Sequence, residues 1–287
     1  MRTVPKWIAA MAALGLAAGC QSVQTTKPGA VGVEREQTMM VSSQSINRSA
    51  EKAYQQVLAE ASRKGRLNRD RQALERVRRV AHRLIPRTGA FRPDAPRWAW
   101  EINVITDSQL NAWCMPGGKI VVYTGLIGAL RLSDDELAAV MGHEMAHALR
   151  EHARERASQA AVQGVGLGVL GAVTGRSGVA DLSGLVLDLT LNLPNSREHE
   201  TEADRIGVEL AARAGYDPRA AVSVWEKMSR RSGGQPPEFL STHPSHAHRI
   251  DDLREYAARV MPLYERSGAR DERPRERDRP GRRDRER

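Results

Sequence analysis

The stretch LAAVMGHEMAHAL, residues 137–149, decides how the chain is interpreted. It carries His143, Glu144 and His147 in the arrangement HExxH. On a helix, residues four apart lie about 40° from each other, so the two histidines project from one face and reach one metal ion. Glu144 lies about 100° from His143, where it contacts a water on that metal and serves as a general base. The other interpretation is an amphipathic helix with two histidines four apart by chance.

The flanking residues favour a helix around this motif. Ser133 precedes Glu136 by three residues, which is the pattern of a capping box. The proline-free run from there to Ala157 predicts one continuous helix. Small residues beside the histidines, Gly142 and Ala146, would let a second element approach closely. A further metal ligand has to come from such an element.

Residues 196–213, SREHETEADRIGVELAAR, predict a second helix with two acidic residues on its small, apolar side. These are Glu200 and Asp204, which are one turn apart. A buried carboxylate needs a partner, so Glu200 is a candidate zinc ligand and Asp204 a candidate acceptor for the free ring N–H of a ligating histidine. The alternative is an internal ion pair with an arginine. The opposite side is expected to be polar and carries Glu198, Glu202, Arg205 and Glu209.

Length and composition suit one domain with extensions at both ends. The chain has 287 residues, 40% of them hydrophobic, which is enough for a buried core. Its net charge of +9 comes with no nucleic-acid-binding motif, so we expect no nucleic-acid partner. Much of the arginine lies in residues 265–287, a mixed-charge tail that we expect to be disordered. The domain itself is predicted to span residues 46–264.

The first 20 residues predict an export signal, because two basic residues precede a short apolar stretch. The signal ends in Leu16-Ala-Ala-Gly-Cys20, which resembles the lipobox of bacterial lipoproteins and implies a lipid anchor on Cys20. The alternative is an ordinary cleaved signal with an incidental cysteine. Gln21 after the cysteine favours, by the same resemblance, an outer-membrane lipoprotein that faces the periplasm. Residues 21–45 are polar and predict a flexible tether.

Ahead of the HExxH helix, the pattern predicts two helices and two strands. Residues 50–64 and 70–85 are expected to be helical. Residues 98–106 and 119–124 are expected to form a β hairpin around a Pro-Gly-Gly turn. Either this hairpin packs on the helices, or its edge binds an extended peptide as an added strand. Cys114, between the strands, is expected to be a buried small hydrophobic residue.

Residues 157–175 contain no charged residue until Arg176 and are interrupted by five glycines. One interpretation is a membrane-inserted hairpin. The preferred one is a mobile loop beside the active site that acts as a lid or substrate groove, because glycine lowers helix propensity and aspartates follow.

Four motifs in consistent order, over roughly residues 46–260, give the chain a family resemblance. They are HExxH, the EADRIG segment after Glu200, NAWCMPGGKIVVYTGLI from Asn111, and STHPSHAHRI from Ser241. Together they resemble the zinc metallopeptidase family numbered forty-eight, and most of all its LoiP-like periplasmic lipoproteins. The resemblance implies a mainly α fold with a small β hairpin or sheet, a zincin-like (gluzincin) domain built around the HExxH helix.

The resemblance also implies the roles of individual residues. Zn²⁺ would be held by His143, His147 and Glu200, with Asp204 supporting them. His243 would lie near the metal, where it occupies the water position in some relatives and restrains activity. Arg249 would steady the oxyanion, a role that suits a cation near developing negative charge. His246 and His248 are expected to be surface residues, and His152 is excluded as a ligand by its helical angle.

These inferences predict a zinc-dependent endopeptidase that cleaves misfolded or unassembled cell-envelope proteins. Glu144 would take a proton from the zinc-bound water as it attacks the peptide carbonyl. The alternative is an outer-membrane lipoprotein chaperone or assembly factor with little proteolysis. Glu144→Gln separates the two, because a chaperone would keep its function and a protease would lose it. The sequence does not specify substrate, cleavage preference or oligomeric state.

Overall fold

The computed structural model describes residues 21–162, 182–231, 238–244 and 248–267. The predicted export signal with Cys20, most of the glycine-rich stretch, His246 and the Arg-rich tail beyond residue 267 lie outside these residues. Within them, the chain is mostly helical with two small sheets, as the sequence predicted.

The central element is helix α5, Asp134–Leu149, which carries HExxH. The predicted capping box is present: the Ser133 side chain accepts from the backbone of Glu136, and the Glu136 side chain accepts in return from the backbone of Ser133. The helix is buried along almost its whole length. The prediction of one continuous helix to Ala157 is wrong, because α5 ends at Leu149. Glu151 adopts a positive φ of 52°, and a new helix, α6, begins at His152 and ends at Val162.

Helix α9, Arg197–Arg213, packs directly against α5 and matches the second predicted helix. Two glycines bring the backbones together. A Cβ on Gly142 would lie 2.8 Å from the Gly207 carbonyl oxygen, and a Cβ on Gly207 would lie 2.6 Å from the His143 nitrogen. Any side chain at either position would push the helices apart, so this contact fixes how closely residues on α9 approach HExxH.

Three strands form a sheet beside α5: β3 (Glu101–Ile105), β4 (Ala112–Met115) and β5 (Lys119–Tyr123), in the order β3-β5-β4. The predicted hairpin between the first and last of them is wrong, because β3 and β5 pair in parallel. The hairpin instead joins β4 to β5, and its turn contains Gly117 and Gly118, both with positive φ. The sequence predicted only a turn between the two strands, whereas the structure has a further strand there, β4, which is fully buried.

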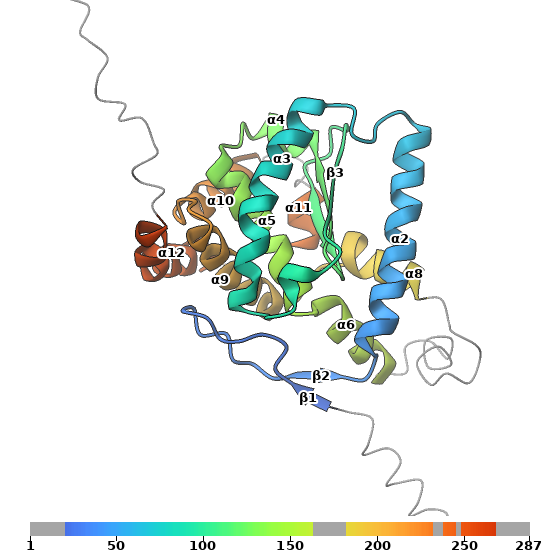
Figure 1. Ribbon diagram of the computed structural model, residues 1–287, viewed down its shortest axis with the longest axis horizontal. Helices are drawn as coiled ribbons and strands as arrows, with labels where there is room; N and C mark the ends of the chain where they lie inside the picture. The colour runs from blue at the N-terminus through green and yellow to red at the C-terminus, as the bar shows by residue number, and fades with distance from the viewer. Residues whose placement is uncertain (1–20, 163–181, 232–237, 245–247, 268–287) are drawn as a thin grey trace, which may run out of the picture.

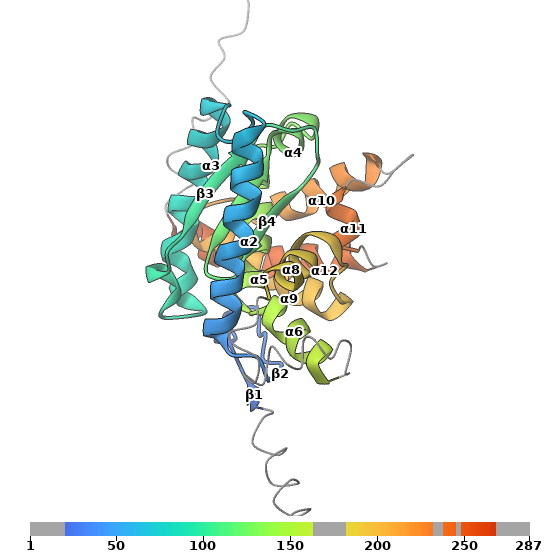
Figure 2. The ribbon, with the colours of Figure 1, turned by 90° about the vertical axis from the view of Figure 1, so that its right-hand side faces the viewer.

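The other helices enclose this centre in layers. Figure 1 shows α2 and α8 on one side of the sheet and α3, α5, α9 and α12 successively on the other, and Figure 2 shows α2 lying across the sheet. Both helices predicted before the sheet are present as α2 and α3, each with an N-cap side chain, Ser42 and Asp70. The bounds of the remaining elements are α2 Ser43–Arg63, α3 Arg71–Leu84, η1 Ile85–Ala90, η2 Ala95–Arg97, α4 Thr124–Ala129, α8 Ser183–Leu187, the π-helical turn η3 Asp188–Asn192, α10 Ala220–Arg231, α11 Glu238–Thr242 and α12 Arg249–Arg266.

Residues 21–41, here called the strap, are packed on the domain and are not the flexible tether that the sequence predicted. Strands β1 (Gln21–Val23) and β2 (Gln37–Met39) pair antiparallel, and Figure 1 shows the strap running below α9 and α6. Val31 and Val33 are almost fully buried. The backbone N–H of Val31 donates to the Glu209 carboxylate at 3.0 Å. The error has a physical reason: key partners of the strap lie more than 100 residues away in the sequence, as in the contacts of Val31 with Glu209 and of Arg35 with Glu155, so no local signal shows what covers its buried side chains.

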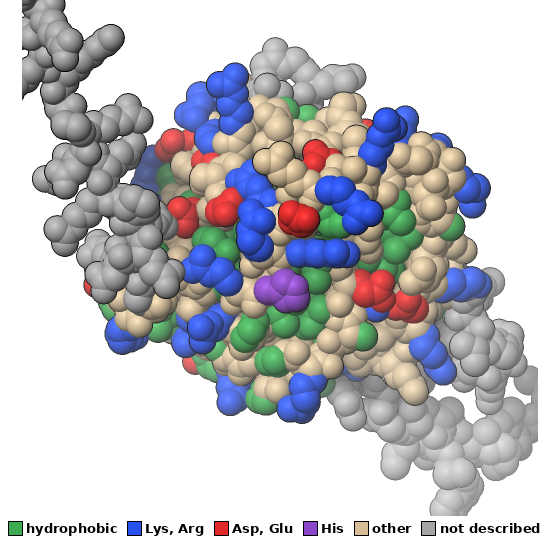
Figure 3. Space-filling model, turned by 45° about the horizontal axis from the view of Figure 1, so that its top comes forward, with side chains coloured by type: hydrophobic (Ala, Val, Ile, Leu, Met, Phe, Trp, Pro, Cys, Tyr) green, Lys and Arg blue, Asp and Glu red, His purple; other side chains and the backbone are tan. Residues whose placement is uncertain are grey.

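Among the described residues, no helix has the length and apolar character needed to cross a membrane. On the face shown in Figure 3, basic side chains alternate with acidic and apolar ones and form no continuous basic surface.

Candidate metal centre

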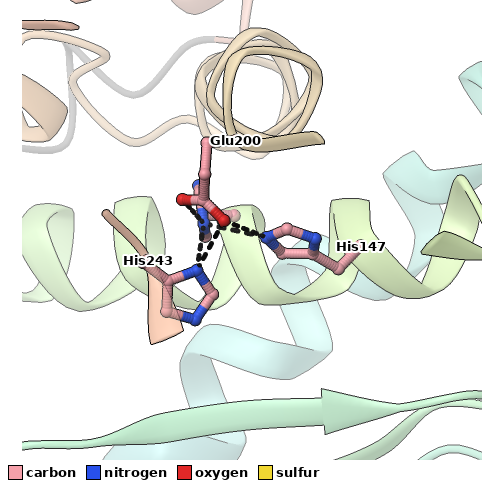
Figure 4. A group of neighbouring side chains, drawn as sticks. His147, Glu200 and His243 are labelled. Atoms are coloured by element: carbon pink, nitrogen blue, oxygen red, sulfur yellow. Dashed lines mark hydrogen bonds and ion pairs between the residues drawn. The ribbon is translucent and has the colours of Figure 1, made fainter. Parts of the chain in front are cut away.

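Four buried side chains converge on one point. His143 and His147 come from α5, Glu200 from α9 and His243 from the residue directly after α11, and one donor atom of each lies within 4.8 Å of the others. Nε2 of His143 is 3.1 Å from Nε2 of His147. The Glu200 carboxylate lies 3.5 Å from the first of these nitrogens and 3.4 Å from the second. The close packing of α5 on α9 produces this arrangement, in which Glu200 points from its helix towards His147 and His243 (Figure 4).

His243 lies at the position near the metal that the family resemblance implied. Its Nδ1 is 3.0 Å from Glu200 Oε1, and its Nε2 is 3.4 Å from Glu144 Oε1. The ring stacks on Phe239, one turn earlier on α11. His243 therefore touches both a predicted ligand and the predicted general base.

Asp204 supports the first histidine of the motif. Its Oδ1 is 2.9 Å from Nδ1 of His143, so the ring N–H there donates to a carboxylate and the Nε2 lone pair faces the cluster. Burial disfavours the charged carboxylate, but the Arg249 guanidinium and the His143 hydrogen bond outweigh it and lower the pKa of Asp204. The structure thus places Asp204 where the helix-face argument expected it.

Arg249 has contacts that differ from its expected role beside the oxyanion. The side chain is 1% exposed, forms ion pairs with Glu200 at 2.9 Å and Asp204 at 2.8 Å, and lies 3.5 Å from the centre of the Trp225 ring. Its guanidinium is engaged by these carboxylates and by the Pro244 carbonyl. The internal ion pair between Glu200 and an arginine, which was the alternative to a zinc ligand, is therefore present beside the histidine contacts of Glu200. His248 is exposed, as expected.

Glu144 borders a small cavity of about 30 Å³ that has room for a water molecule. The lining also includes His147, His243 and Cys114. Oε1 of Glu144 is buried and accepts no hydrogen bond from the described residues. Burial raises the pKa of Glu144. A carboxylate oxygen that accepts no hydrogen bond, on a residue beside a water-sized space, is suited to take a proton from water.

Cys114 is 4% exposed, and burial raises the pKa of its thiol well above the usual value. It lies on β4 and its Sγ contacts the Met115 carbonyl. These features agree with a buried small hydrophobic residue.

His152 is the neighbour that the sequence reasoning missed. It was excluded as a ligand on the assumption of one continuous helix, and it does lie outside the ligand cluster. However, the break at Glu151 turns its ring back, and its Nδ1 lies 2.8 Å from Nδ1 of His147. No glycine or proline marks this break, so the sequence offered no signal for the contact.

The two histidines of HExxH differ in their protonation. Burial opposes protonation of His143, but hydrogen bonds to Asp204 and Glu200 prevail and raise its pKa to about 9. Burial lowers the pKa of His147 to about 3. A proton therefore competes with a metal for the His143 ring more strongly than for the His147 ring.

The charges of the site fit a divalent cation. Three carboxylates contact the cluster, those of Glu144, Glu200 and Asp204, whereas Arg249 is the one guanidinium paired with them among the described residues. Glu200 Oε2 is buried and accepts no hydrogen bond there, although the Arg249 guanidinium lies 2.9 Å from it. Two imidazole nitrogens and a carboxylate within ligand distance of each other are the donor set of catalytic zinc sites.

Comparison with known proteins agrees with this geometry. The model of Peptidase family M48 matches residues 71–257. The mitochondrial metalloendopeptidase OMA1 of Arabidopsis thaliana is 42% identical over 147 residues, which cover 51% of this chain and 29% of that protein. OMA1 of Saccharomyces cerevisiae is 36% identical over 176 residues, which cover 58% of this chain and 50% of that protein. The beta-barrel assembly-enhancing protease of Escherichia coli is 32% identical over 176 residues, which cover 57% of this chain and 36% of that protein. The chain thus spans half or less of these relatives' length. Since the family model covers most of the chain, the protein belongs to peptidase family M48.

Proposed function

We propose that this protein is a zinc-dependent endopeptidase that cleaves unfolded or misassembled proteins of the cell envelope. The observation that carries the proposal is Glu144, which lines a water-sized cavity beside the His143, His147 and Glu200 cluster and whose buried Oε1 accepts no hydrogen bond from the described residues. The names of the relatives, two metalloendopeptidases and a protease, support the activity.

His143, His147 and Glu200 would hold the zinc. When bound, zinc polarises a carbonyl and lowers the pKa of water towards 7. Glu144 would accept a proton from the attacking water at Oε1 and deliver it to the leaving amine. Burial raises its pKa above the usual value, which strengthens it as a proton acceptor. Asp204 would keep the His143 ring oriented by accepting its Nδ1–H.

The location and the substrates rest on other observations. The lipobox-like sequence at Cys20 supports an outer-membrane lipoprotein that faces the periplasm, and the name of the E. coli relative supports envelope substrates. Acyl labelling of the wild type and of Cys20→Ser, followed by membrane fractionation, tests the anchor. We expect label and membrane association in the wild type alone, and label in both would contradict the assignment of Cys20.

The catalytic proposal is tested by Glu144→Gln in the full chain, with Glu136→Gln as a matched control on the same helix. Glu136 is also a buried carboxylate, but it belongs to the capping box and binds Lys227. We expect about one zinc per chain in all three proteins and at least about 100-fold slower cleavage of an unfolded substrate in Glu144→Gln alone.

Two outcomes would contradict this. Zinc in every protein with no cleavage in the wild type would favour the chaperone alternative, most clearly if Glu144→Gln kept the ability to prevent aggregation. A wild type purified without chelators that retains no zinc would refute the metal centre.

A further inference from the structure

A second set of polar side chains lies next to His147, on the side away from the ligand cluster. His152 contacts His147, and its Nε2 is 3.0 Å from Glu202 Oε2. Glu202 in turn lies between two arginines, Arg35 of the strap and Arg150. A continuous series of contacts therefore connects the strap to a residue of HExxH.

The hydrogen bonds of this series have one consistent direction. Glu202 is an acceptor of guanidinium N–H groups, and its pKa is lowered despite burial by Arg35 and Arg150. His152 therefore donates its Nε2–H to Glu202, which leaves its Nδ1 as an acceptor. His147 then donates its own Nδ1–H to His152, and its Nε2 lone pair faces Glu200 and His143. This is the tautomer that ligates a metal through Nε2.

Arg35 connects the strap to the two helices that carry this series. Its guanidinium donates to both oxygens of Glu155 on α6, at 2.6 and 2.9 Å, and to both oxygens of Glu202 on α9, at 2.8 and 3.1 Å. The backbone carbonyl of Arg35 also accepts from Arg150. One planar side chain thus fixes the relative positions of α6, which presents His152, and α9, which presents Glu202.

A second metal is a weaker explanation of this group. His152, Glu155 and His199 meet the spacing that a metal needs. However, the two carboxylates here, Glu155 and Glu202, are already balanced by the guanidinium groups of Arg35 and Arg150. The group is neutral without a metal, unlike the cluster around Glu200.

We propose that Arg35 is a positioning residue for the metal centre. The docked strap, acting through Glu202 and His152, holds His147 with Nε2 free to ligate. The inference rests on the proposed function, because it assumes that His147 binds zinc. It also implies that displacement of the strap weakens metal binding at a site that the strap does not touch.

Zinc affinity of the full chain, measured by competition with a chromophoric chelator, tests this. The variants are Arg35→Met, the conservative Arg35→Lys, and Arg213→Met as a matched control. Arg213 forms a comparable ion pair with buried Glu209 on the same helix, close to the strap, but is not connected to His152. We expect about 10-fold weaker zinc binding in Arg35→Met, the lower end of the range for supporting residues, and a smaller loss in Arg35→Lys. In Arg213→Met, the affinity should stay within about twofold of the wild type, since nothing links it to the ligands.

A double-mutant cycle separates positioning from a general loss of stability. His152→Phe keeps a ring that stacks on His199 but removes the acceptor for His147. We expect Arg35→Met to have no further effect on zinc affinity in the His152→Phe background. The absorption spectrum of the Co²⁺-substituted protein should also change in Arg35→Met and not in Arg213→Met, because it reports ligand geometry.

The inference is overturned if Arg35→Met binds zinc like the wild type, or if its loss persists in full in the His152→Phe background. Equal losses in Arg35→Met and Arg213→Met would have the same meaning. A wild type that binds no zinc would instead refute the proposed function, so the two failures are distinguishable.

Discussion

Helix α9 buries acidic side chains on two opposite faces, and the two faces differ in their partners. Glu200 and Asp204 face α5, whereas Glu202 and Glu209 face the strap. On the strap face, each carboxylate pairs with arginine. On the α5 face, the two share Arg249 with each other and otherwise contact histidines.

The comparison teaches that burial of a carboxylate does not by itself indicate a metal site. What distinguishes the α5 face is a shortage of cations together with imidazole nitrogens at ligand distance. The strap face has equal burial and a balanced charge. The predictions below change one face or the other and compare the results.

The largest expected effect is the loss of zinc in Glu200→Gln. A structural zinc site of four ligands contributes about 10–16 kcal/mol, so loss of one ligand should weaken binding on the order of a hundredfold to a thousandfold. Chelator competition measures this, with Glu209→Gln as the same substitution on the other face of α9. Near-equal affinities of the two variants would mean that Glu200 is not a ligand.

In the metal-free protein, the substitution on the strap face should have the larger effect, and the quantity compared is the free energy of unfolding. Glu202→Gln leaves the buried Arg150 and the partly buried Arg35 short of a partner and should cost about 3 kcal/mol of unfolding free energy. Glu200→Gln should cost less, because Arg249, the guanidinium paired with Glu200, keeps its ion pair with Asp204. Urea unfolding in the presence of a chelator measures both. If Glu200→Gln were the more destabilising, the two faces would not differ in charge balance as described.

The contact between the helices is tested by Gly207→Ala. The added Cβ would lie 2.6 Å from the His143 backbone, so the helices have to separate, at a cost of about 1–3 kcal/mol, and zinc binding should weaken as Glu200 moves away. Gly128→Ala, on α4, is the control, because a Cβ there meets nothing within 4 Å. The free energy of unfolding and the zinc affinity are measured on the same proteins. An unchanged zinc affinity would mean that this contact does not set the distance between Glu200 and the histidines.

The smallest effect concerns acid stability of the strap face. Burial would raise the pKa of Glu155 and Glu202, but their hydrogen bonds to Arg35 lower both below the usual 4.5. Such groups stabilise the folded state fully above pH 4.5, and this contribution is lost as pH falls below it. In Arg35→Met, the fall of unfolding free energy below pH 4.5 should be shallower by about 1 kcal/mol per pH unit. Urea midpoints of the metal-free proteins from pH 3 to pH 6 check this, and parallel curves would contradict it.

The sequence predicted the parts of the site that depend on local spacing. The capping box at Ser133, the helix that carries HExxH and the inward face with Glu200 all follow from positions within a few residues of one another. The same reasoning failed for Glu202 and Glu209, which were assigned to an exposed polar side. They are buried because the strap covers them, and the strap was not recognised.

The other errors also involve partners distant in sequence or breaks without a marker. The parallel pairing of β3 with β5 was not visible in two alternating segments separated by a turn. The chain changes direction at Glu151, which brings His152 to His147. No glycine or proline occurs there, so the sequence does not indicate the break.

The strap has a consequence for the order in which the protein folds. Arg35 is separated from Glu202 by 167 residues, and Val31 from Glu209 by 178. During synthesis from the N-terminus, the strap emerges early and can contact Glu155 of α6 first, but its pairs with Glu202 and Glu209 have to wait for α9. A nascent chain with HExxH but not yet α9 lacks both Glu200 and Glu202, the second acceptor of Arg35. The proposed third ligand and the last partners of the strap arrive on the same helix, so the metal centre and the docking of the strap are completed in one late step.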